Sequence, residues 1–214
     1  MENLNKAVPS QTFRRLPDYH SLLVKMDEQG AENVSSTVIA GILKLNDVVV
    51  RKDLAAVSES GGKPRTGYAV RELMKQIGAC LGYYNTNDAV LVGAGQLGRA
   101  LLSYDGFSEY GVRIVAAFDS NSGIAGLEKN GKPIMNISEL PDYCRQRKIR
   151  IGIITAPAKA AQTICDLLVS GGIMAVWNFA PTHLVVPEGV FVHNENMARS
   201  LSLLSQHLAQ KDRS

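Results

Sequence analysis

Three glycines, Gly93, Gly95 and Gly98, stand at G-x-G-x-x-G spacing directly after the apolar run Val90–Val92. In a dinucleotide-binding turn, the first glycine permits a tight turn, the second lets a pyrophosphate approach the backbone, and the third lets the next helix pack on the strand. The pyrophosphate would bind the free N–H groups at the start of that helix. A plain structural turn is the alternative, because a chain with 19 glycines can reach this spacing by chance.

An acidic residue supports the dinucleotide interpretation. Val112–Phe118 is a second apolar run, and Asp119 follows it at roughly the 20-residue offset at which an acidic side chain binds the ribose hydroxyls of adenosine. Because no arginine stands just after this carboxylate, a 2′-phosphate would be repelled, and we predict NAD(H) in preference to NADP(H). The residues expected to hold it are Gly93, Ala94, Gly95, Gln96, Leu97, Gly98 and Asp119.

The remainder of this half alternates strands with helices. After a loop at Gly123–Gly131, strands are expected at Arg150–Thr155 and Ile173–Trp177, with a helix at Ala158–Ser170 between them. This order predicts a Rossmann-like, doubly wound parallel sheet with right-handed crossovers. Ligands bind such sheets at the carboxyl ends of the strands, although ordinary turn chemistry also explains these residues. The nicotinamide half is therefore expected beside Thr155, Ala156, Pro157, Asn178 and Phe179.

The N-terminal third reads as a series of helices. Pro9 and Ser10 can start a helix, with a second piece beginning at Pro17. Ser35-Ser36 can cap a short helix through Leu43, and Asn46 or Asp47 can cap another that runs to about Val57. Two short helices joined by a tight turn predict a helix-turn-helix.

Four cations lie where such a motif would meet DNA. Arg51 and Lys52 stand off the apolar face of the second helix, and Lys63 and Arg65 lie in a glycine-punctuated loop before a short strand at Tyr68–Val70. That loop predicts a β-wing whose cations bind phosphates or the minor groove, while the helix enters the major groove. A winged helix that binds protein, with ordinary surface cations, is the alternative.

The last segment, Asn196–Gln210, has apolar residues at helical spacing: Met197, Leu201, Leu204 and Leu208. This seam could pack on its own domain or on a second subunit. We predict an α/β chain with a winged helix-turn-helix domain at 1–84, a Rossmann NAD(H)-binding domain at 85–194 and a C-terminal dimerisation helix at 195–214.

Composition narrows the function classes. The net charge of +3 is mild, and neither a membrane span nor a signal-peptide core is evident, so a cytoplasmic protein is expected. The three cysteines form no C-x-x-C pair, which argues against disulfides and a thiolate metal site. His183 and His193 have no acid beside them to support hydride-transfer catalysis. Because only one helix follows the Rossmann unit, no substrate domain is left, and we expect a nucleotide that acts as a signal rather than an enzyme.

Taken together, these residues resemble the Rex family of bacterial redox-sensing transcriptional repressors over nearly the whole chain. The matching stretches are Arg15-Leu16-Pro17-x-Tyr19, Val50-Arg51-Lys52-Asp53-Leu54, Gly67-Tyr68-x-Val70, Val92-Gly93-x-Gly95-x-Leu97-Gly98, Phe118-Asp119, Ala158-x-Ala160-Ala161-Gln162 and Asn178-Phe179-Ala180-Pro181.

The resemblance implies a homodimer with exchanged C-terminal helices, whose winged helices bind a palindromic double-stranded DNA operator. It implies that NAD(H) is a regulatory ligand and that NADH closes the dimer and releases the DNA. It also implies a polar switch at the positions of Arg15, Tyr104 and Asn196, where the family has Asp in place of Asn196. Other departures are Gln96, where some members have Arg, and Ala56-Val57-Ser58, where the family usually has Tyr-Phe-Gly.

Two other classes stay open at this point. A small NAD-dependent oxidoreductase would need a substrate site, which the sequence does not supply. A Rossmann interaction module without DNA binding would leave the basic clusters at Arg51/Lys52 and Lys63/Arg65 unexplained.

Overall fold

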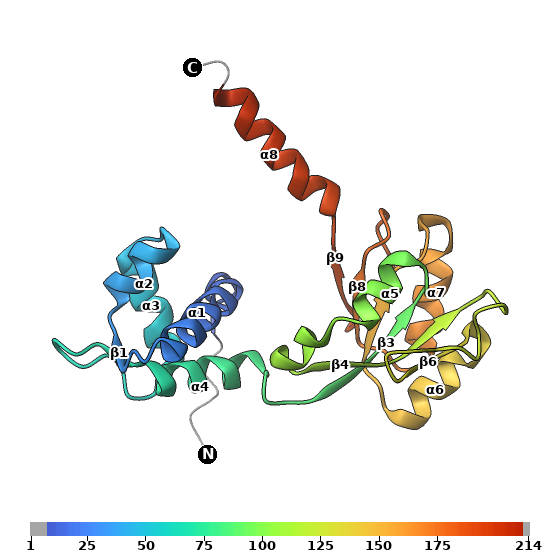
Figure 1. Cartoon of the computed structure of the whole chain (residues 1–214), viewed down its shortest axis with the longest axis horizontal. Helices are drawn as coiled ribbons and strands as arrows, with labels where there is room; N and C mark the ends of the chain where they lie inside the picture. The colour runs from blue at the N-terminus through green and yellow to red at the C-terminus, as the bar shows by residue number, and fades with distance from the viewer. Residues whose placement is uncertain (1–7, 212–214) are drawn as a thin grey trace. The chain divides into compact units, whose positions relative to one another are not determined.

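The computed structural model describes residues 8–211, apart from some side chains of the last helix. Its chain divides into two compact units, Met1–Asn85 and Thr86–Ser214 (Figure 1). Each unit has hydrophobic core clusters of its own.

The first unit contains a helix-turn-helix, as predicted. The Ser35 side chain accepts a hydrogen bond from the Val38 N–H and caps the first helix of the motif, and the Asn46 side chain caps the second through the Val48 N–H. Between them Lys44 ends the first helix in the left-handed region, at φ 54°. The elements are α1 (Ser10–Glu28), β1 (Asn33–Val34), α2 (Ser36–Leu43), α3 (Asp47–Val57), β2 (Tyr68–Ala69) and α4 (Val70–Leu81).

The first helix differs from the prediction. It is a single helix from Ser10 to Glu28 with Pro17 inside it, rather than two pieces that meet at the proline. A proline inside a helix removes a backbone hydrogen bond. Here the loss is offset because Leu16, Tyr19 and Leu23 are completely buried on the face that packs into the core.

The second unit is built on a seven-stranded sheet in the order β5-β6-β4-β3-β7-β8-β9, in which the β5–β6 pair is antiparallel and the other pairs are parallel. From β3 the chain proceeds to β4 and β6 on one side, then crosses to β7 on the other. The strand order therefore reverses between β3 and β7, which is where such sheets bind ligands. The strands are β3 (Asn87–Val92), β4 (Val112–Asp119), β5 (Glu128–Lys129), β6 (Lys132–Asn136), β7 (Ile151–Ile154), β8 (Ala175–Asn178) and β9 (Phe191–Asn194).

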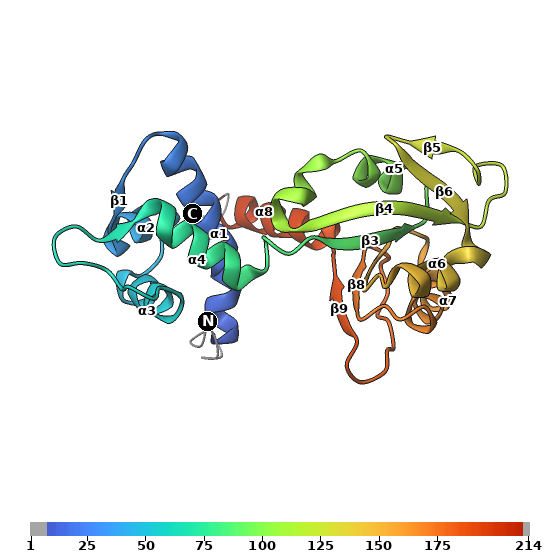
Figure 2. The same cartoon turned by 90° about the horizontal axis from the view of Figure 1, so that it is seen from below.

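Helices cover both faces of this sheet, and Figure 2 shows α5 on one side and α6 and α7 on the other. Alternate residues of β3 follow this division. Val90 and Val92 belong to one core cluster, and Ala89 and Leu91 to another. The connecting elements are α5 (Gln96–Leu102), the 3-10 helices η1 (Asp105–Tyr110) and η2 (Ile137–Glu139), α6 (Leu140–Arg147) and α7 (Ala158–Ser170).

Three strands were not predicted. The loop expected at Gly123–Gly131 contains β5, which pairs with β6, and the edge strand β9 extends the sheet beyond β8. The strand β5 consists of two charged residues and β6 has Pro133 at its second position, so neither shows the apolar alternation by which strands are recognised. In addition, β8 begins and ends later than the strand expected at Ile173–Trp177.

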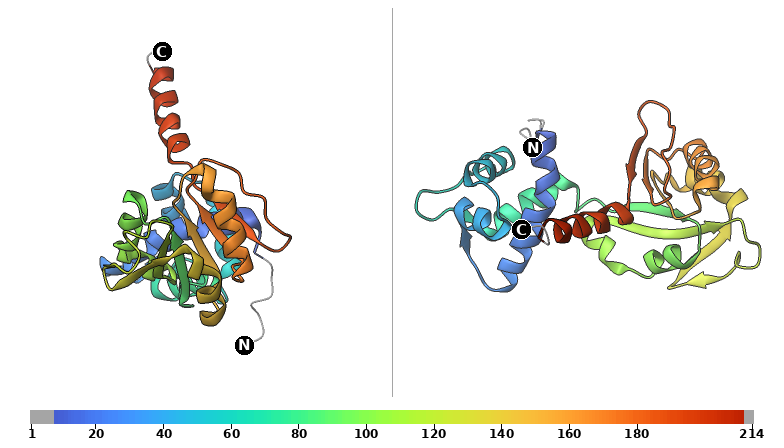
Figure 3. Two further views of the ribbon diagram at one scale, coloured as in Figure 1. Left: turned by 90° about the vertical axis from the view of Figure 1, so that its right-hand side faces the viewer. Right: turned by 90° about the horizontal axis from the view of Figure 1, so that it is seen from above.

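The helix α8 (Met197–Lys211), dark red in Figure 3, follows β9. Its leucines Leu201, Leu204 and Leu208 are 67%, 63% and 62% exposed, so this chain alone leaves the predicted seam uncovered. The side chain of Met197, the fourth residue of that seam, lies outside the described residues. Across residues 8–211, no helix combines the length and the apolar character needed to cross a lipid bilayer.

Candidate functional site

The three glycines of the turn after β3 have three different surroundings. Gly93 has φ 104°, a conformation that favours glycine, and its N–H donates to the Phe118 carbonyl at 2.8 Å. A Cβ at Gly98 would stand 2.0 Å from the Gly93 carbonyl oxygen, so only glycine lets α5 approach the turn. A Cβ at Gly95 would meet nothing within 4 Å. The open space thus lies at the glycine where a pyrophosphate approaches the backbone in dinucleotide-binding turns.

Asp119 is held beside this turn by two backbone groups. The parallel pairing of Val92 with Phe118 brings the end of β4 next to the end of β3. One Asp119 carboxylate oxygen accepts a hydrogen bond from the Ala94 N–H at 2.7 Å, and the other accepts one from the Asn121 N–H at 2.8 Å. Because a carboxylate can accept about four hydrogen bonds, capacity remains for two ribose hydroxyls.

Thr155 ties the turn to β7 across the reversal of strand order. Its N–H donates to the Val92 carbonyl at 2.9 Å, and its hydroxyl donates to the Gly93 carbonyl at 2.7 Å. A Cβ at Gly93 would stand 2.9 Å from the Ala156 nitrogen, so these two strand ends are in close contact. Pro157 is the residue directly before α7 and makes no side-chain capping bond. The predicted strand-end segment Thr155–Pro157 therefore lies beside the glycine turn.

Asn178 was expected to line the crevice at the carboxyl end of a strand. It is the last residue of β8, and its side chain is completely buried. Its side-chain nitrogen donates to Thr182 and Asn194 at 2.9 Å, and its side-chain oxygen accepts the Ala180 N–H at 3.0 Å. Its amide therefore folds the following loop. Phe179 is half-buried, with its ring centroid 4.4 Å from that of Trp177.

The four cations expected to meet DNA are all exposed. Arg51 and Lys52 lie on α3, and Lys63 and Arg65 lie on the hairpin between α3 and β2. In residues 8–211 none of the four takes part in a salt bridge. The wing is closed by two 2.8 Å backbone hydrogen bonds between Lys63 and Gly67. The exposed charges are thus free to bind an anion.

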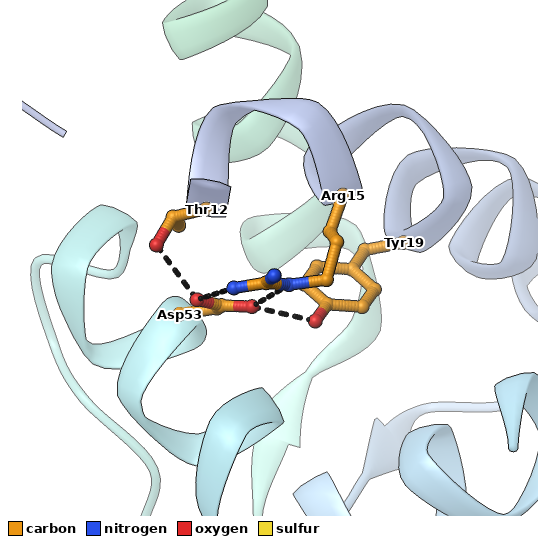
Figure 4. A network of polar contacts seen from close by, with 4 residues as sticks. All are labelled: Thr12, Arg15, Tyr19 and Asp53. Carbon is orange, nitrogen blue, oxygen red and sulfur yellow. Dashed lines mark hydrogen bonds and ion pairs between the residues drawn. The ribbon is translucent and has the colours of Figure 1, made fainter. Parts of the chain in front are cut away.

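A buried polar network joins α3 to α1, and the sequence did not predict it. In Figure 4 the side chains of Thr12, Arg15 and Tyr19, all from α1, converge on Asp53 of α3. The Asp53 carboxylate accepts two bonds from the Arg15 guanidinium, at 2.7 and 2.9 Å, and one from each hydroxyl, at 2.7 Å. Asp53 is 3% exposed, so this ion pair anchors the inner face of α3.

The network determines how its members ionise. Burial on its own raises the pKa of the Asp53 carboxyl, but the hydrogen bonds from Arg15, Thr12 and Tyr19 outweigh it and hold the pKa below its ordinary value. Burial, followed by the hydrogen bond to Asp53, raises the pKa of Tyr19 to about 12. The bond to Asp53 also raises the pKa of Arg15. The carboxylate and guanidinium are therefore both charged at neutral pH.

The three expected switch residues lie in different places. Arg15 belongs to the network in the first unit, whereas Tyr104 and Asn196 belong to the second. Tyr104 is 55% exposed, with its ring edge-on to that of Phe107 at 4.9 Å. Asn196 is exposed in the two-residue connection between β9 and α8.

An apolar hollow of about 470 Å³ lies on the second unit. It is on the α5 side of the sheet, where Phe107 and Trp177 pack edge-on with their centroids 5.8 Å apart. Its lining combines aromatic and aliphatic side chains with two polar residues: Tyr104, Phe107, Tyr110, Val112, Ile151, Ile153, Trp177, His193 and Glu195. Sequence reasoning missed this feature because its residues come from η1 and four different strands or strand ends.

Comparisons with known proteins agree with this division of the chain. A family model described as CoA binding domain matches residues 85–182, and one described as putative DNA-binding protein N-terminus matches residues 7–55. The redox-sensing transcriptional repressor Rex of Porphyromonas gingivalis is 39% identical over 94% of this chain and 92% of its own length. The chain belongs to the Rex family of redox-sensing transcriptional repressors.

Solved structures of a Rex-family repressor, RSP, have the same fold. The complex of RSP with β-NAD⁺ and operator DNA is 31% identical and matches with a TM-score of 0.89, over 97% of this chain and 95% of that one. The complex with β-NADH matches with a TM-score of 0.87 over 97% of both chains. Because the Rex similarity covers nearly the whole chain, it includes β9 and α8, which lie beyond both family models.

Proposed function

We propose that this Rex-family chain is a transcriptional repressor that senses the balance of NADH and NAD⁺. Its first unit binds operator DNA, and NADH bound to its second unit releases that DNA. The observation that carries the proposal is the presence on one chain of a winged helix with four exposed cations that form no salt bridge within residues 8–211, and of a glycine turn with a fixed carboxylate. RSP, solved with operator DNA and with each redox form of the nucleotide, supports it.

In this proposal the turn from Gly93 to Gly98 binds the pyrophosphate, and Asp119 accepts hydrogen bonds from the adenosine ribose. The open space at Gly95 and the two N–H groups that orient Asp119 support this assignment. The nicotinamide half lies beside Thr155–Pro157 and Phe179, while Asn178 acts through the loop that it holds. Arg99, whose side chain donates to the Ala94 carbonyl at 2.9 Å, adds a cation beside the turn that the sequence did not single out.

Coenzyme A is a second ligand to consider because of the family model that matches this unit. It shares with NAD an adenosine diphosphate half, which is the part that a glycine turn and an acid recognise. Its adenosine ribose carries a phosphate, which the Asp119 carboxylate would repel. We therefore propose NAD(H) and expect coenzyme A to compete weakly with it.

The operator is bound by the recognition helix α3 and the wing. Arg51 and Lys52 lie on the exposed side of α3, where they can contact DNA. Lys63 and Arg65 lie on the wing and bind phosphates or the minor groove. Asp53 supports this interface from within, because it fixes α3 to α1 without exposing its negative charge to DNA.

The protein forms a homodimer in which the two chains exchange their α8 helices. Each chain has both an exposed leucine seam on α8 and an apolar hollow on its sheet, and the two are complementary in character. Exchange between two chains covers both surfaces, whereas water would otherwise contact them. A two-fold symmetric dimer binds two half-sites in opposite orientations, so the operator is palindromic.

The switch in this chain differs from the pattern of the family. Where family members have a carboxylate that competes for Arg15, this chain has Asn196, and a neutral amide makes a hydrogen bond about half as strong as a charged one. Arg15 is already paired with Asp53 in its own unit. We therefore propose a shifted or shallower response to NADH, in which Tyr104 still takes part.

The relatives are named as repressors, and we propose that this chain is likewise not an enzyme and works in the cytoplasm. A small NAD-dependent oxidoreductase would instead turn NADH over with a carbonyl compound. Incubation of the purified protein with NADH and small aldehydes or ketones tests this, and steady loss of NADH absorbance would contradict the proposal.

The DNA interface is tested by the salt dependence of binding to the region upstream of its own gene. Lys63→Ala should reduce the log–log salt slope by about 0.9, because one fewer phosphate is neutralised. Lys129→Ala removes an exposed charge from the second unit and should leave the slope unchanged. If alanine at all four cations left DNA affinity at low salt intact, the DNA-binding assignment would be wrong.

A further inference from the structure

Asn178 holds three pieces of the second unit together. Its side-chain nitrogen donates to the backbone carbonyl of Thr182 at 2.9 Å and to that of Ala180 at 3.2 Å. Both residues lie in the loop that follows β8. The same nitrogen donates to the Asn194 side-chain oxygen at 2.9 Å, at the end of β9. Its backbone carbonyl accepts the Glu195 N–H at 2.8 Å.

Only an asparagine satisfies this site. It needs two donors on one atom, for Thr182 and Asn194, and an acceptor for the Ala180 N–H. Aspartate would direct a carboxylate oxygen at these acceptor oxygens, and an apolar residue would leave buried polar groups without partners. Asn178 is also the one polar side chain that is fully buried in the described part of the second unit. A buried amide with every bond satisfied fixes its surroundings in a single arrangement.

Asn178 contacts two segments that lead to different parts of the second unit. On one side is the loop that begins with Phe179, whose N–H donates to the Ile154 carbonyl at the carboxyl end of β7. That edge of the sheet is where the nicotinamide half is proposed to lie. On the other side are Asn194 and Glu195, after which one residue remains before α8 begins. The amide therefore lies between the edge of the nucleotide site and the start of α8.

We propose that Asn178 is a positioning residue that couples the nucleotide site to α8 through its hydrogen bond to Asn194. A nucleotide that moves the Phe179 loop also moves the Asn178 amide, and the amide pair carries that movement to the entry of α8. Since α8 is the helix proposed to be exchanged in the dimer, its entry angle affects the spacing of the two winged helices. This inference rests on the proposed function and identifies residues through which its regulation passes.

The test removes the coupling bond and leaves the loop intact. In Asn194→Ala the Asn178 nitrogen keeps Thr182 and Ala180 as acceptors, so no buried donor loses its last partner. Asn194 is exposed, and its truncation should leave thermal stability unchanged. The matched control is Gln162→Ala. The Gln162 amide fixes the same β8–β9 connection through two 2.9 Å bonds to Val185, but it makes no bond to β9 in the described residues.

Each variant is titrated with NADH, and its affinity for operator DNA is measured with and without saturating NADH. Asn194→Ala should bind NADH and free operator like the parent, while the NADH-dependent ratio of DNA affinities falls by about fivefold or more, the lower end of typical couplings. Gln162→Ala should keep the parent ratio.

Other outcomes overturn the inference. An unchanged ratio in Asn194→Ala would show that the amide pair carries no coupling. Loss of NADH affinity or of free-operator affinity in that variant would assign Asn194 a purely structural role. A parent protein whose DNA affinity does not respond to NADH at all would instead contradict the proposed function, so the two failures are distinguishable.

Discussion

Removal of the Asp53 carboxylate should destabilise the first unit, because four hydrogen bonds converge on this side chain. Asp53→Ala takes away the acceptor for four hydrogen bonds from Thr12, Arg15 and Tyr19. Thr12 is 5% exposed and Tyr19 is fully buried, so water cannot replace the acceptor without disturbing the core. The Arg15 side chain is 26% exposed, and its guanidinium can turn toward solvent.

The exposure of each donor determines how much folding stability Asp53→Ala should lose. A buried donor left without a partner costs about 1–3 kcal/mol, and two hydroxyls lose theirs here. Breaking a buried ion pair from one side costs about 3–5 kcal/mol in general, and the partial exposure of Arg15 places its contribution near the lower end. Asp53→Ala should therefore cost at least about 3 kcal/mol. The matched control is Asp47→Ala on the same helix. Asp47 is half-buried and accepts from Ser36 and Thr37, and its loss should cost about 1 kcal/mol.

Urea unfolding of the full chain, followed by circular dichroism, measures both variants against the parent. A loss for Asp53→Ala no larger than that for Asp47→Ala would refute the view that the network anchors α3. The pH dependence gives a second check. Because the folded pKa of Asp53 lies below its unfolded value, its stabilisation is present above about pH 4 and is lost as the pH falls through the folded pKa. Tyr19 affects stability at alkaline pH. Because its folded pKa is raised to about 12, the free energy of unfolding should fall between about pH 10 and 12. Asp53→Ala should lose the acid-side dependence.

Four further variants test the nucleotide site and the switch. Gly95→Ala should fold like the parent, since its Cβ meets nothing within 4 Å, yet bind NADH weakly because the methyl group fills the space for the pyrophosphate. Gly98→Ala should lose both NADH binding and about 1–3 kcal/mol of stability, because its Cβ clashes with the Gly93 carbonyl; calorimetry that found both variants alike would contradict these roles. Asp119→Ala should weaken NADH by about tenfold or more, since a hydrogen bond to a charged acceptor contributes ~1.5–3 kcal/mol, and unchanged affinity would refute the placement of adenosine. Asn196→Asp should enlarge the NADH-dependent ratio of DNA affinities, and an unchanged ratio would remove this position from the switch.

Local patterns explain what the sequence could predict. The glycine turn and the caps of α2 and α3 depend on residues within a few positions of one another. Asp119 was found from the known offset between the glycine turn and the end of the next strand. The same holds for the strand–helix alternation from β3 to α7. These features follow from backbone conformation and hydrophobic periodicity, which a single sequence displays.

Features that depend on distant residues were missed. The Asp53 network joins residues 34 to 41 positions apart, and each of its members also reads as an ordinary helix residue. Burial of Leu16 and Tyr19 decided that α1 continues through Pro17, and the sequence does not show which helix faces are buried. The strand β8 ends at Asn178, which pairs with Ile154 of β7 and with Asn194 of β9. Because β9 was not predicted, neither was the bond from the Asn178 amide to Asn194.

In this protein one chain is proposed to link nucleotide binding to DNA binding. The most direct measurement is the affinity for operator DNA from its own upstream region, titrated with saturating NADH, with saturating NAD⁺ and with neither. We expect NADH to weaken operator binding by about 5- to 150-fold. Because coupling between two sites is reciprocal, operator DNA should weaken NADH binding by the same factor. Operator affinity that is equal under all three conditions would contradict it.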